Sequence, residues 1–302
     1  MVEYCGNRLL IVTIVLVPTQ LICVVLRLFV RYRSQMKFGL DDLVVVLSLV
    51  GQLAIAGVIF AELKYSGIGY HRSYLTTINP DLIISERKYR VVTAYLYVIN
   101  ANLPKISILL LYRRLFAPTV LRLISTAIIW ILSLVIIAKI LLVSFVCRPF
   151  AANWNQDIPG TKCLNMQAVS SWSTLPNIIT DVGMLLLPVP VVWSLHTKLQ
   201  TKIQLTFTFA LGSLGLVTSI LRFQFFFGTE TEDVTWSAVH RTIWTEVEPA
   251  VYLICACIIT YKPLLDRLTF KKLRKGSSSS GSEVQAPRDL HSRDEWVSLE
   301  SR

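Results

Sequence analysis

Six charged residues lie deep inside apolar stretches of the sequence, where a charge needs a partner or a water-filled cavity. They are Lys105, Lys139, Asp181, Arg222, Glu246 and Glu248. Cations and carboxylates nearly balance, which predicts pairing between helices but leaves each partner open. The same residues fit two roles, a structural ion-pair network or a polar ligand pocket. In the pocket, Asp181 and Glu248 would be the acid/base or ligand-binding groups, and Lys105 and Arg222 would contact the same ligand.

Lys105 belongs to a stretch that begins apolar and ends in the basic pair Arg113-Arg114. Such a run suits a membrane, because its apolar part can cross the hydrocarbon while the arginines stop at the headgroups. An ionisable group within the span then indicates function. Arg27 and Glu62 lie near the ends of their own apolar stretches, where we expect their long side chains to reach water.

Two short motifs flank the second apolar stretch. Gly39-Leu40-Asp41-Asp42 is typical of a helix N-terminus, with carboxylates at the positive end of the dipole. The alternative is that Asp41 and Asp42, with Arg113 and Arg114, contact a cytoplasmic partner. The motif Gly67-Ile68-Gly69-Tyr70-His71 predicts a tight turn. Its alternative is a ligand-facing loop with His71 as a titratable contact.

Two of the six cysteines, Cys147 and Cys163, bracket one loop on the predicted outer side. We expect a disulfide between them, and closing a loop of this size stabilises a fold by roughly 3 kcal/mol. Cys23, Cys255 and Cys257 fall inside apolar stretches, where they act as small hydrophobic residues. No cysteine–histidine spacing fits a metal site, so we expect no metal.

The composition places all these residues in a membrane. The chain has 302 residues, of which 53% are hydrophobic and 16% charged, whereas a soluble domain carries about 25% charged residues. Seven apolar segments approach the ~20 residues that a helix needs to cross the hydrocarbon. They run approximately over 9–30, 43–63, 91–112, 122–146, 175–195, 203–227 and 242–261. We therefore predict an all-α, polytopic seven-transmembrane-helix bundle in the plasma membrane or an endomembrane.

Lysine and arginine placement predicts the topology, because basic loops stay cytoplasmic. It favours an outer N-terminus and a cytoplasmic C-terminus, although the loop 64–90 is basic and must face outward. The predicted organisation is a short outer segment 1–8, a membrane domain 9–261, a basic amphipathic juxtamembrane segment 262–275 and a disordered Ser-rich tail 276–302. The net charge of +11 then fits anionic lipid headgroups and topology, and we expect no nucleic-acid partner.

Retinal is disfavoured as a cofactor. Retinal-binding pumps attach retinal through a lysine in the middle of the seventh span, and 242–261 contains no lysine. Nor does the third span end in the Asp/Glu-Arg-Tyr signature of animal rhodopsin-like receptors, since its end reads Leu111-Tyr112-Arg113-Arg114. We therefore expect no cofactor.

An ordered set of motifs nevertheless resembles one family, the fungal rhodopsin-domain integral membrane proteins. The matching pieces are Arg31-Tyr32-Arg33, Gly39–Asp42, Gly67–His71, Leu103–Ser107, Tyr112–Phe116, Cys147-Arg148-Pro149, Trp154, Cys163, Asp181, Leu187–Pro190, Arg222 and Trp244–Glu248, which together cover about 27–265. The resemblance implies a seven-helix fold, an outer N-terminus and a fungal source. Members are described as receptor-like and are often encoded near secondary-metabolite genes, and the resemblance implies no proven activity or light sensing.

Three classes of function follow. The favoured one is a receptor-like sensor or accessory protein of fungal secondary metabolism, with an outer pocket near 64–90 and 147–173 and output through Arg113, Arg114 and the tail. The second is a membrane cyclase or isomerase that protonates a lipophilic intermediate through Asp181 or Glu248. The third is a transporter or scaffold, and the lack of internal repeats argues against a repeat-built transporter. Expected partners are membrane lipids, a lipophilic small molecule and a cytoplasmic signalling protein.

Overall fold

Long helices form the architecture, because a chain in hydrocarbon must satisfy its backbone hydrogen bonds internally. The computed structural model describes residues 4–33, 35, 37–79, 81–115, 119–155, 158–187, 199–227 and 234–277. The chain divides into two compact units, Met1–Lys262 and Pro263–Arg302. The helices are α1 (Gly6–Arg33), α2 (Leu40–Tyr65), α3 (Arg72–Ile78), α4 (Asp81–Asn100), α5 (Leu103–Leu115), α6 (Thr119–Phe145), α7 (Met166–Leu186), α9 (Leu199–Phe227) and α10 (Val234–Ser277).

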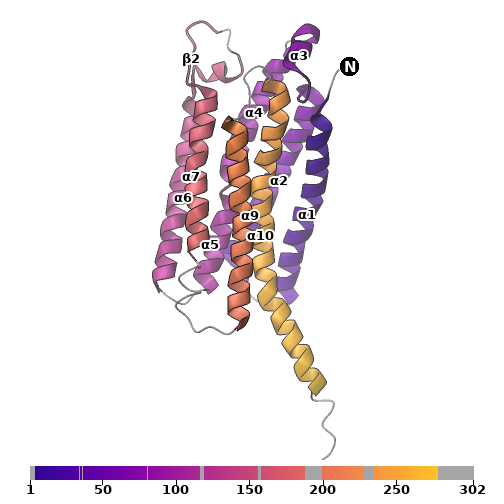
Figure 1. Cartoon of the computed structure of the whole chain (residues 1–302), viewed down its shortest axis with the longest axis vertical. Coiled ribbons are helices and arrows are strands. Elements are labelled where there is room, and N and C mark those ends of the chain that lie inside the picture. The colour runs from indigo at the N-terminus through magenta and orange to yellow at the C-terminus, as the bar shows by residue number, and fades with distance from the viewer. Residues whose placement is uncertain are drawn as a thin grey trace, which may run out of the picture. The chain divides into compact units, whose positions relative to one another are not determined.

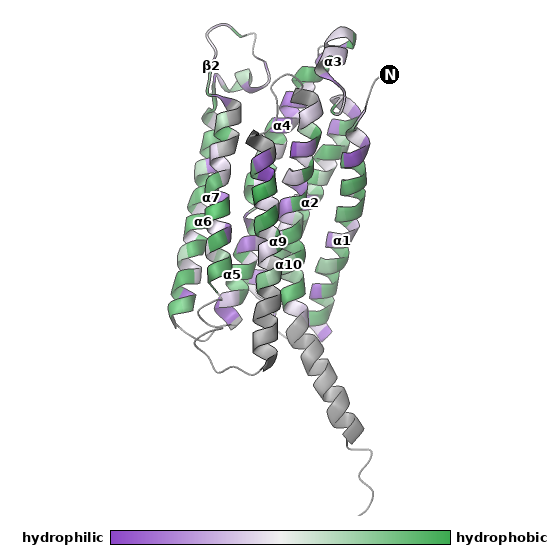
Figure 2. Cartoon of the chain, viewed as in Figure 1, coloured by the Kyte–Doolittle hydropathy of each residue, from purple (hydrophilic) through white to green (hydrophobic). Residues whose placement is uncertain are grey.

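Within the first unit, the long helices lie side by side as a bundle (Figure 1). Among the described residues, five helical stretches are long and apolar enough to cross a membrane: Gly6–Arg33, Leu40–Tyr65, Asp81–Arg114 (α4 with α5), Val120–Phe145 and Trp236–Tyr261. Their outward surfaces are apolar (Figure 2), as on α6, where Trp130, Leu134 and Ile137 are exposed. The protein is thus an all-helical, multi-pass membrane protein. The seven-span count stays a prediction, because α7 and α9 are not among the five.

The third predicted span is two helices rather than one. Helix α4 ends at Asn100 and α5 begins at Leu103, with a turn at Ala101 and Asn102. Pro104 accounts for the break, because its ring has no N–H to donate and clashes with the carbonyl four residues earlier. The break leaves the Val98 carbonyl without its helical N–H partner, and the Asn102 side-chain amide donates to this carbonyl at 2.8 Å instead.

Several predicted boundaries are corrected. The segment 64–90 is not a loop, because α3 and the first ten residues of α4 occupy much of it. Helix α7 starts at Met166, earlier than the predicted 175, and its predicted continuation over 188–195 lies outside the described residues. Helix α10 runs through 262–275 to Ser277, so the first two residues of the predicted disordered tail 276–302 are helical, and 278–302 lie outside the described residues.

One end of the bundle carries the disulfide and the predicted turn. Strands β1 (Cys147–Arg148) and β2 (Lys162–Cys163) pair antiparallel around a short 3₁₀ helix, Phe150–Asn153, and the disulfide Cys147–Cys163 joins them as predicted. The turn before α3 lies at the same end (Figure 1). Gly67 and Gly69 take positive φ angles of 67° and 95°, which confirms that turn, since side-chain-bearing residues rarely adopt them.

Candidate functional site

Three of the charged residues in the apolar stretches lie one helical turn from a polar neighbour. On α7, Asn177 precedes Asp181 by four residues, and on α10, Tyr252 follows Glu248 by four. On α9, Ser219 precedes Arg222 by three residues. Residues three or four apart share one helix face, so each helix brings a pair of polar groups to the centre of the bundle. These residues, with Lys105 of α5 and Tyr97 of α4, are called the ionic centre below.

Lys105 and Asp181 form the first ion pair of the ionic centre. The Lys105 Nζ lies 2.5 Å from the Asp181 Oδ1, and both side chains are 0% exposed. Lys105 also donates to the Asn177 Oδ1 at 2.9 Å, and its Nζ lies 4.7 Å from the centre of the Tyr252 ring. A buried ammonium is tolerated when paired and hydrogen-bonded in this way. The pair joins α5 to α7.

Glu248 is the acceptor of the second pair. The Arg222 Nη1 lies 3.3 Å from the Glu248 Oε2, and the Tyr97 hydroxyl donates to the same oxygen at 2.8 Å. Asn177 donates its amide N–H to the Glu248 Oε1, so one asparagine contacts both pairs. The Arg222 guanidinium also lies over the Tyr97 ring, 3.7 Å from its centre. Glu248 therefore links α10 to α4, α7 and α9.

Ser219 connects the two carboxylates. Its hydroxyl oxygen lies 2.6 Å from the Asp181 Oδ2 and 2.9 Å from the Glu248 Oε1. A hydroxyl carries a single proton, so Ser219 is shared between the two acids. The predicted pairing between helices is thus present, with partners that the sequence left open: Lys105 with Asp181, and Arg222 with Glu248.

The two other charged residues of the set lie outside these pairs. Glu246 accepts a hydrogen bond from Thr13 of α1 at 2.7 Å. Lys139 of α6 is 7% exposed, and among the described residues its ammonium has neither an ion pair nor a hydrogen bond. Four charged groups act on it electrostatically: Arg222, Lys105, Glu248 and Asp181. Lys139 is therefore a buried neighbour of the ionic centre that shares in neither of its pairs.

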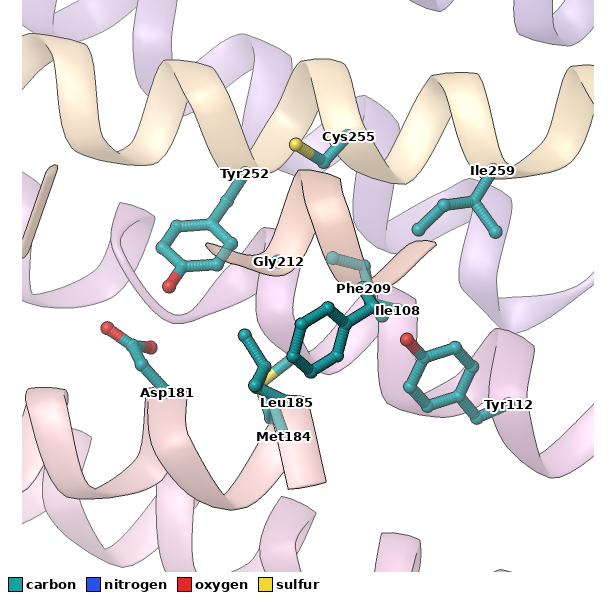
Figure 3. Close-up of a pocket in the computed structure, with 10 residues that line it drawn as sticks. All are labelled: Ile108, Tyr112, Asp181, Met184, Leu185, Phe209, Gly212, Tyr252, Cys255 and Ile259. Atoms are coloured by element: carbon teal, nitrogen blue, oxygen red, sulfur yellow. The ribbon is translucent and has the colours of Figure 1, made fainter. Parts of the chain in front are cut away.

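The cavity beside the ionic centre is small. It lies next to Asp181 and Tyr252 and is lined by apolar groups such as Ile108, Met184 and Phe209 (Figure 3). Its volume is about 30 Å³, room for about two waters at roughly 10–15 Å³ each. Drug-sized ligands occupy pockets of about 300–1,000 Å³. In this conformation, the space beside the two carboxylates is not substrate-sized.

A second ionic cluster overturns the expectation that Arg27 reaches water. Arg27 is 0% exposed, and its guanidinium lies 2.7 Å from Asp41 and 3.0 Å from Asp42. It also donates to the Ala256 carbonyl of α10 at 2.5 Å, and Arg31 pairs with the same two aspartates. The start of α2 brings its carboxylates to α1, so the arginine is neutralised in place. Glu62 is likewise buried rather than solvated, at 3% exposure.

The remaining predicted contacts have mixed placements. Asp42 accepts a hydrogen bond from the Gly39 N–H at 3.1 Å, which confirms the helix N-terminus. Asp41 and Asp42 are buried in the second cluster, whereas Arg113 and Arg114 are exposed. Arg114 nevertheless reaches this cluster, since its Nη1 lies 3.7 Å from the Asp41 Oδ1. A cytoplasmic contact formed by these four residues therefore stays a prediction.

His71 lies away from the loop of the disulfide, in the turn before α3. Its ring stacks on Trp236, 4.4 Å between ring centres. Trp236 lines an open hollow of about 390 Å³ with Tyr4, Asn7 and Arg8. A ligand contact by His71 stays a prediction, and this hollow is the feature next to which it would form.

Sequence reasoning missed the uncharged members of the ionic centre, which are Tyr97, Asn177, Ser219 and Tyr252. A signal was present for three of them, because Asn177, Ser219 and Tyr252 each lie three or four residues from a buried charge. Tyr97 carried no such signal. It reaches Glu248 from α4, 151 residues away in the sequence.

Comparisons with known proteins found one family model and several fungal relatives. A family model described as "Fungal rhodopsin domain" matches residues 26–267. The chain is 34% identical over 299 residues to the "Polyenoic acids biosynthesis gene cluster protein Ba17b" of Metarhizium anisopliae, covering 95% of this chain and 81% of that relative. It is 29% identical over 170 residues to a "SAT4 family membrane protein" of Emericella nidulans, covering 55% of this chain and 44% of the relative. It is 24% identical over 209 residues to the "Fugralins biosynthesis cluster protein 2" of Gibberella zeae, covering 67% and 51%. No solved structure matches the chain.

Proposed function

Since the chain belongs to the fungal rhodopsin domain family, we propose that it is a receptor-like sensor of a lipophilic small molecule in secondary metabolism. One observation carries the proposal. The carboxylates that would be catalytic in an enzyme are engaged in ion pairs that tie α4, α5, α7, α9 and α10 together. A network with discrete partners can hold one helix arrangement and release another when a ligand competes for it.

The same geometry disfavours the enzyme alternative. A general acid must carry a proton at working pH, and a neighbouring cation favours the ionised carboxylate instead. Asp181 lies 2.5 Å from the Lys105 ammonium, and Glu248 lies 3.3 Å from Arg222. The neighbouring cavity of about 30 Å³ is also far below the about 300 Å³ of a small substrate site.

The names of the relatives support a link to metabolism. Two are named for the biosynthesis clusters of polyenoic acids and of fugralins. A polyenoic acid is a lipophilic carboxylic acid, a class of molecule that partitions into membranes and reaches a helix bundle from the lipid. We place the present chain in the same setting, as a membrane component of a pathway whose product or intermediate is lipophilic.

We further propose seven spans, with the N-terminus outside and the C-terminus cytoplasmic. The disulfide Cys147–Cys163 supports this orientation, because disulfides persist in oxidising compartments. The exposed Arg113 and Arg114 would then face the cytoplasm, as the positive-inside rule requires, and offer a surface to a signalling partner. The proposal includes no retinal, because Trp236–Tyr261 contains no lysine.

Metabolite mass spectrometry on the fungus tests the proposal. The wild type is compared with a deletion strain and with the double variant Asp181→Asn/Glu248→Gln, with Glu246→Gln as the matched control on α10. A sensor predicts that the pathway's metabolites rise or fall together in the first two altered strains, while the control resembles the wild type. If one precursor accumulates and a product of simply related mass disappears, the enzyme reading replaces ours. Immunoblots confirm that each variant reaches the membrane.

A further inference from the structure

The buried centre holds more basic than acidic side chains. Three cations lie in or next to it, Lys105, Lys139 and Arg222, against two carboxylates, Asp181 and Glu248. The two carboxylates are each within 4 Å of one cation. Lys139 is therefore the surplus charge. It is buried to more than nine-tenths and has no ion pair or hydrogen bond among the described residues.

Lys139 lies on the inward face of α6, opposite its lipid-facing side chains. Ile137 and Leu141, two residues to either side, are 55% and 52% exposed on the outer surface of the helix. Lys139 itself is turned inward, toward the ionic centre. It lies six residues before Phe145, the end of α6, which is about 9 Å along the axis at about 1.5 Å per residue. The site thus lies on the inner side of α6, within the bundle and away from the end of the helix.

A lone ammonium at this depth is costly, so it needs an anion or must lose its proton. We propose that Lys139 binds the carboxylate of a lipophilic acid, whose hydrocarbon chain extends from the inward face of α6 out to the surrounding lipid. This inference rests on the proposed function and names the class of its ligand. A phospholipid offers similar anionic chemistry, but its phosphate belongs at the headgroup level, and the depth of Lys139 favours a free acid.

The same contact would couple binding to the ion pairs. A third carboxylate beside Lys139 balances the charges of the centre at three and three. It also repels Asp181 and Glu248, which act on Lys139 already, and attracts the two cations that neutralise them. Ligand and helix network therefore compete for Lys105 and Arg222, which is the differential interaction that a two-state sensor requires.

Ligand binding to the purified full chain in zwitterionic nanodiscs tests the site. The probe is a fluorescent polyene fatty acid, cis-parinaric acid, and its methyl ester is the uncharged control. We expect saturable binding of the acid and at least about tenfold weaker binding of the ester. Lys139→Met should weaken acid binding by about tenfold or more, and Lys139→Arg should retain it, because one lost ion pair of about 1.4 kcal/mol is a factor of ten. Lys162→Met, at an exposed lysine of β2, is the matched control and should bind like the wild type.

Three outcomes would overturn the site: equal binding of acid and ester, unchanged acid binding by a folded Lys139→Met variant, or displacement of the acid by phosphatidylserine nanodiscs. The last would assign Lys139 to a phospholipid. Thermal unfolding checks that the variant is folded, and removal of an unpaired charge should leave it at least as stable as the wild type. The in vitro assay is independent of the metabolite assay. If the acid does not bind but the whole pathway still responds in vivo, only the Lys139 site is disproved. If a single precursor accumulates in vivo, the sensor function is disproved and the Lys139 site is unaffected.

Discussion

Loss of one partner from a buried ion pair leaves the other charge buried without compensation. Each charged residue of the ionic centre therefore contributes to stability through its partner. Lys105→Met would leave Asp181 buried beside a neutral side chain, and we expect a loss of about 3–5 kcal/mol in unfolding free energy. Lys105→Met/Asp181→Leu removes both charges and should recover much of that loss. Equilibrium unfolding in mixed SDS micelles measures both.

Glu246→Gln serves as the control for this comparison. Glu246 is also buried, but it accepts from Thr13 and belongs to neither ion pair of the centre. We expect its neutral amide to keep a contact with the Thr13 hydroxyl, so its effect should be well below that of Lys105→Met. Equal losses in the single and the double variant would show that Lys105 acts through its packing on Tyr252 rather than through its charge.

Charges were the part of the centre that the sequence could predict, since a lysine or an aspartate in an apolar run is conspicuous. Their partners depend on which helices are neighbours and on how each helix is rotated about its axis. The local sequence pattern predicts neither. Arg27 shows the consequence. Its place near the end of α1 suggested contact with water, but Asp41 and Asp42 from the start of α2 reach it first.

At the scale of the element, the approach of α9 to α10 depends on one glycine. A Cβ at Gly215 would lie 2.4 Å from the Cζ of Tyr252 and 2.7 Å from its hydroxyl, closer than side chains pack. Gly215→Ala should push α9 away from α10, weaken the Arg222–Glu248 pair and destabilise the protein by about 1–3 kcal/mol. Thermal unfolding in detergent measures the loss.

Gly57→Ala on α2 is the matched control, because nothing lies within 4 Å of a Cβ built there. Alanine is the better helix former by about 1 kcal/mol, so this variant should be as stable as the wild type or more so. If Gly215→Ala matches Gly57→Ala, the close contact with Tyr252 is absorbed by movement of that ring and α9 is not held by this glycine.

The helices themselves follow from hydrophobic runs, whereas their ends do not. The break between α4 and α5 had a visible cause in Pro104, but the run 91–112 is long and apolar enough to read as one span. Helix α4 begins at Asp81, among charged residues that a search for apolar membrane spans passes over. Those residues form helix because Leu, Glu, Arg and Lys are good helix formers, and the pair of Glu86 with Arg90, four residues apart, adds to it.

At the scale of the whole molecule, the positive-inside rule and the disulfide make a joint prediction of orientation. The disulfide and the start of α1 lie at one end of the bundle (Figure 1), and the Cys5 N–H donates to the Gly69 carbonyl at 3.2 Å, which ties the N-terminal segment to the turn before α3. An epitope tag at the N-terminus should therefore be on the outer or lumenal side, and a tag at the C-terminus on the cytoplasmic side. Antibody staining before and after selective permeabilisation with digitonin, which opens the plasma membrane first, distinguishes the two.

The tagged proteins also test whether the number of spans is odd, as the seven-span arrangement requires. An odd number of crossings puts the termini on opposite sides, whereas the five candidate helices plus only one of α7 and α9 would put them on the same side. A tag inserted after Gly160, where φ is +82° and nothing lies within 4 Å of a Cβ, should share the side of the N-terminus. Termini on the same side would remove the seven-span arrangement, and with it the cytoplasmic surface proposed for Arg113 and Arg114, while the ion pairs that join α5, α7, α9 and α10 would stand unchanged.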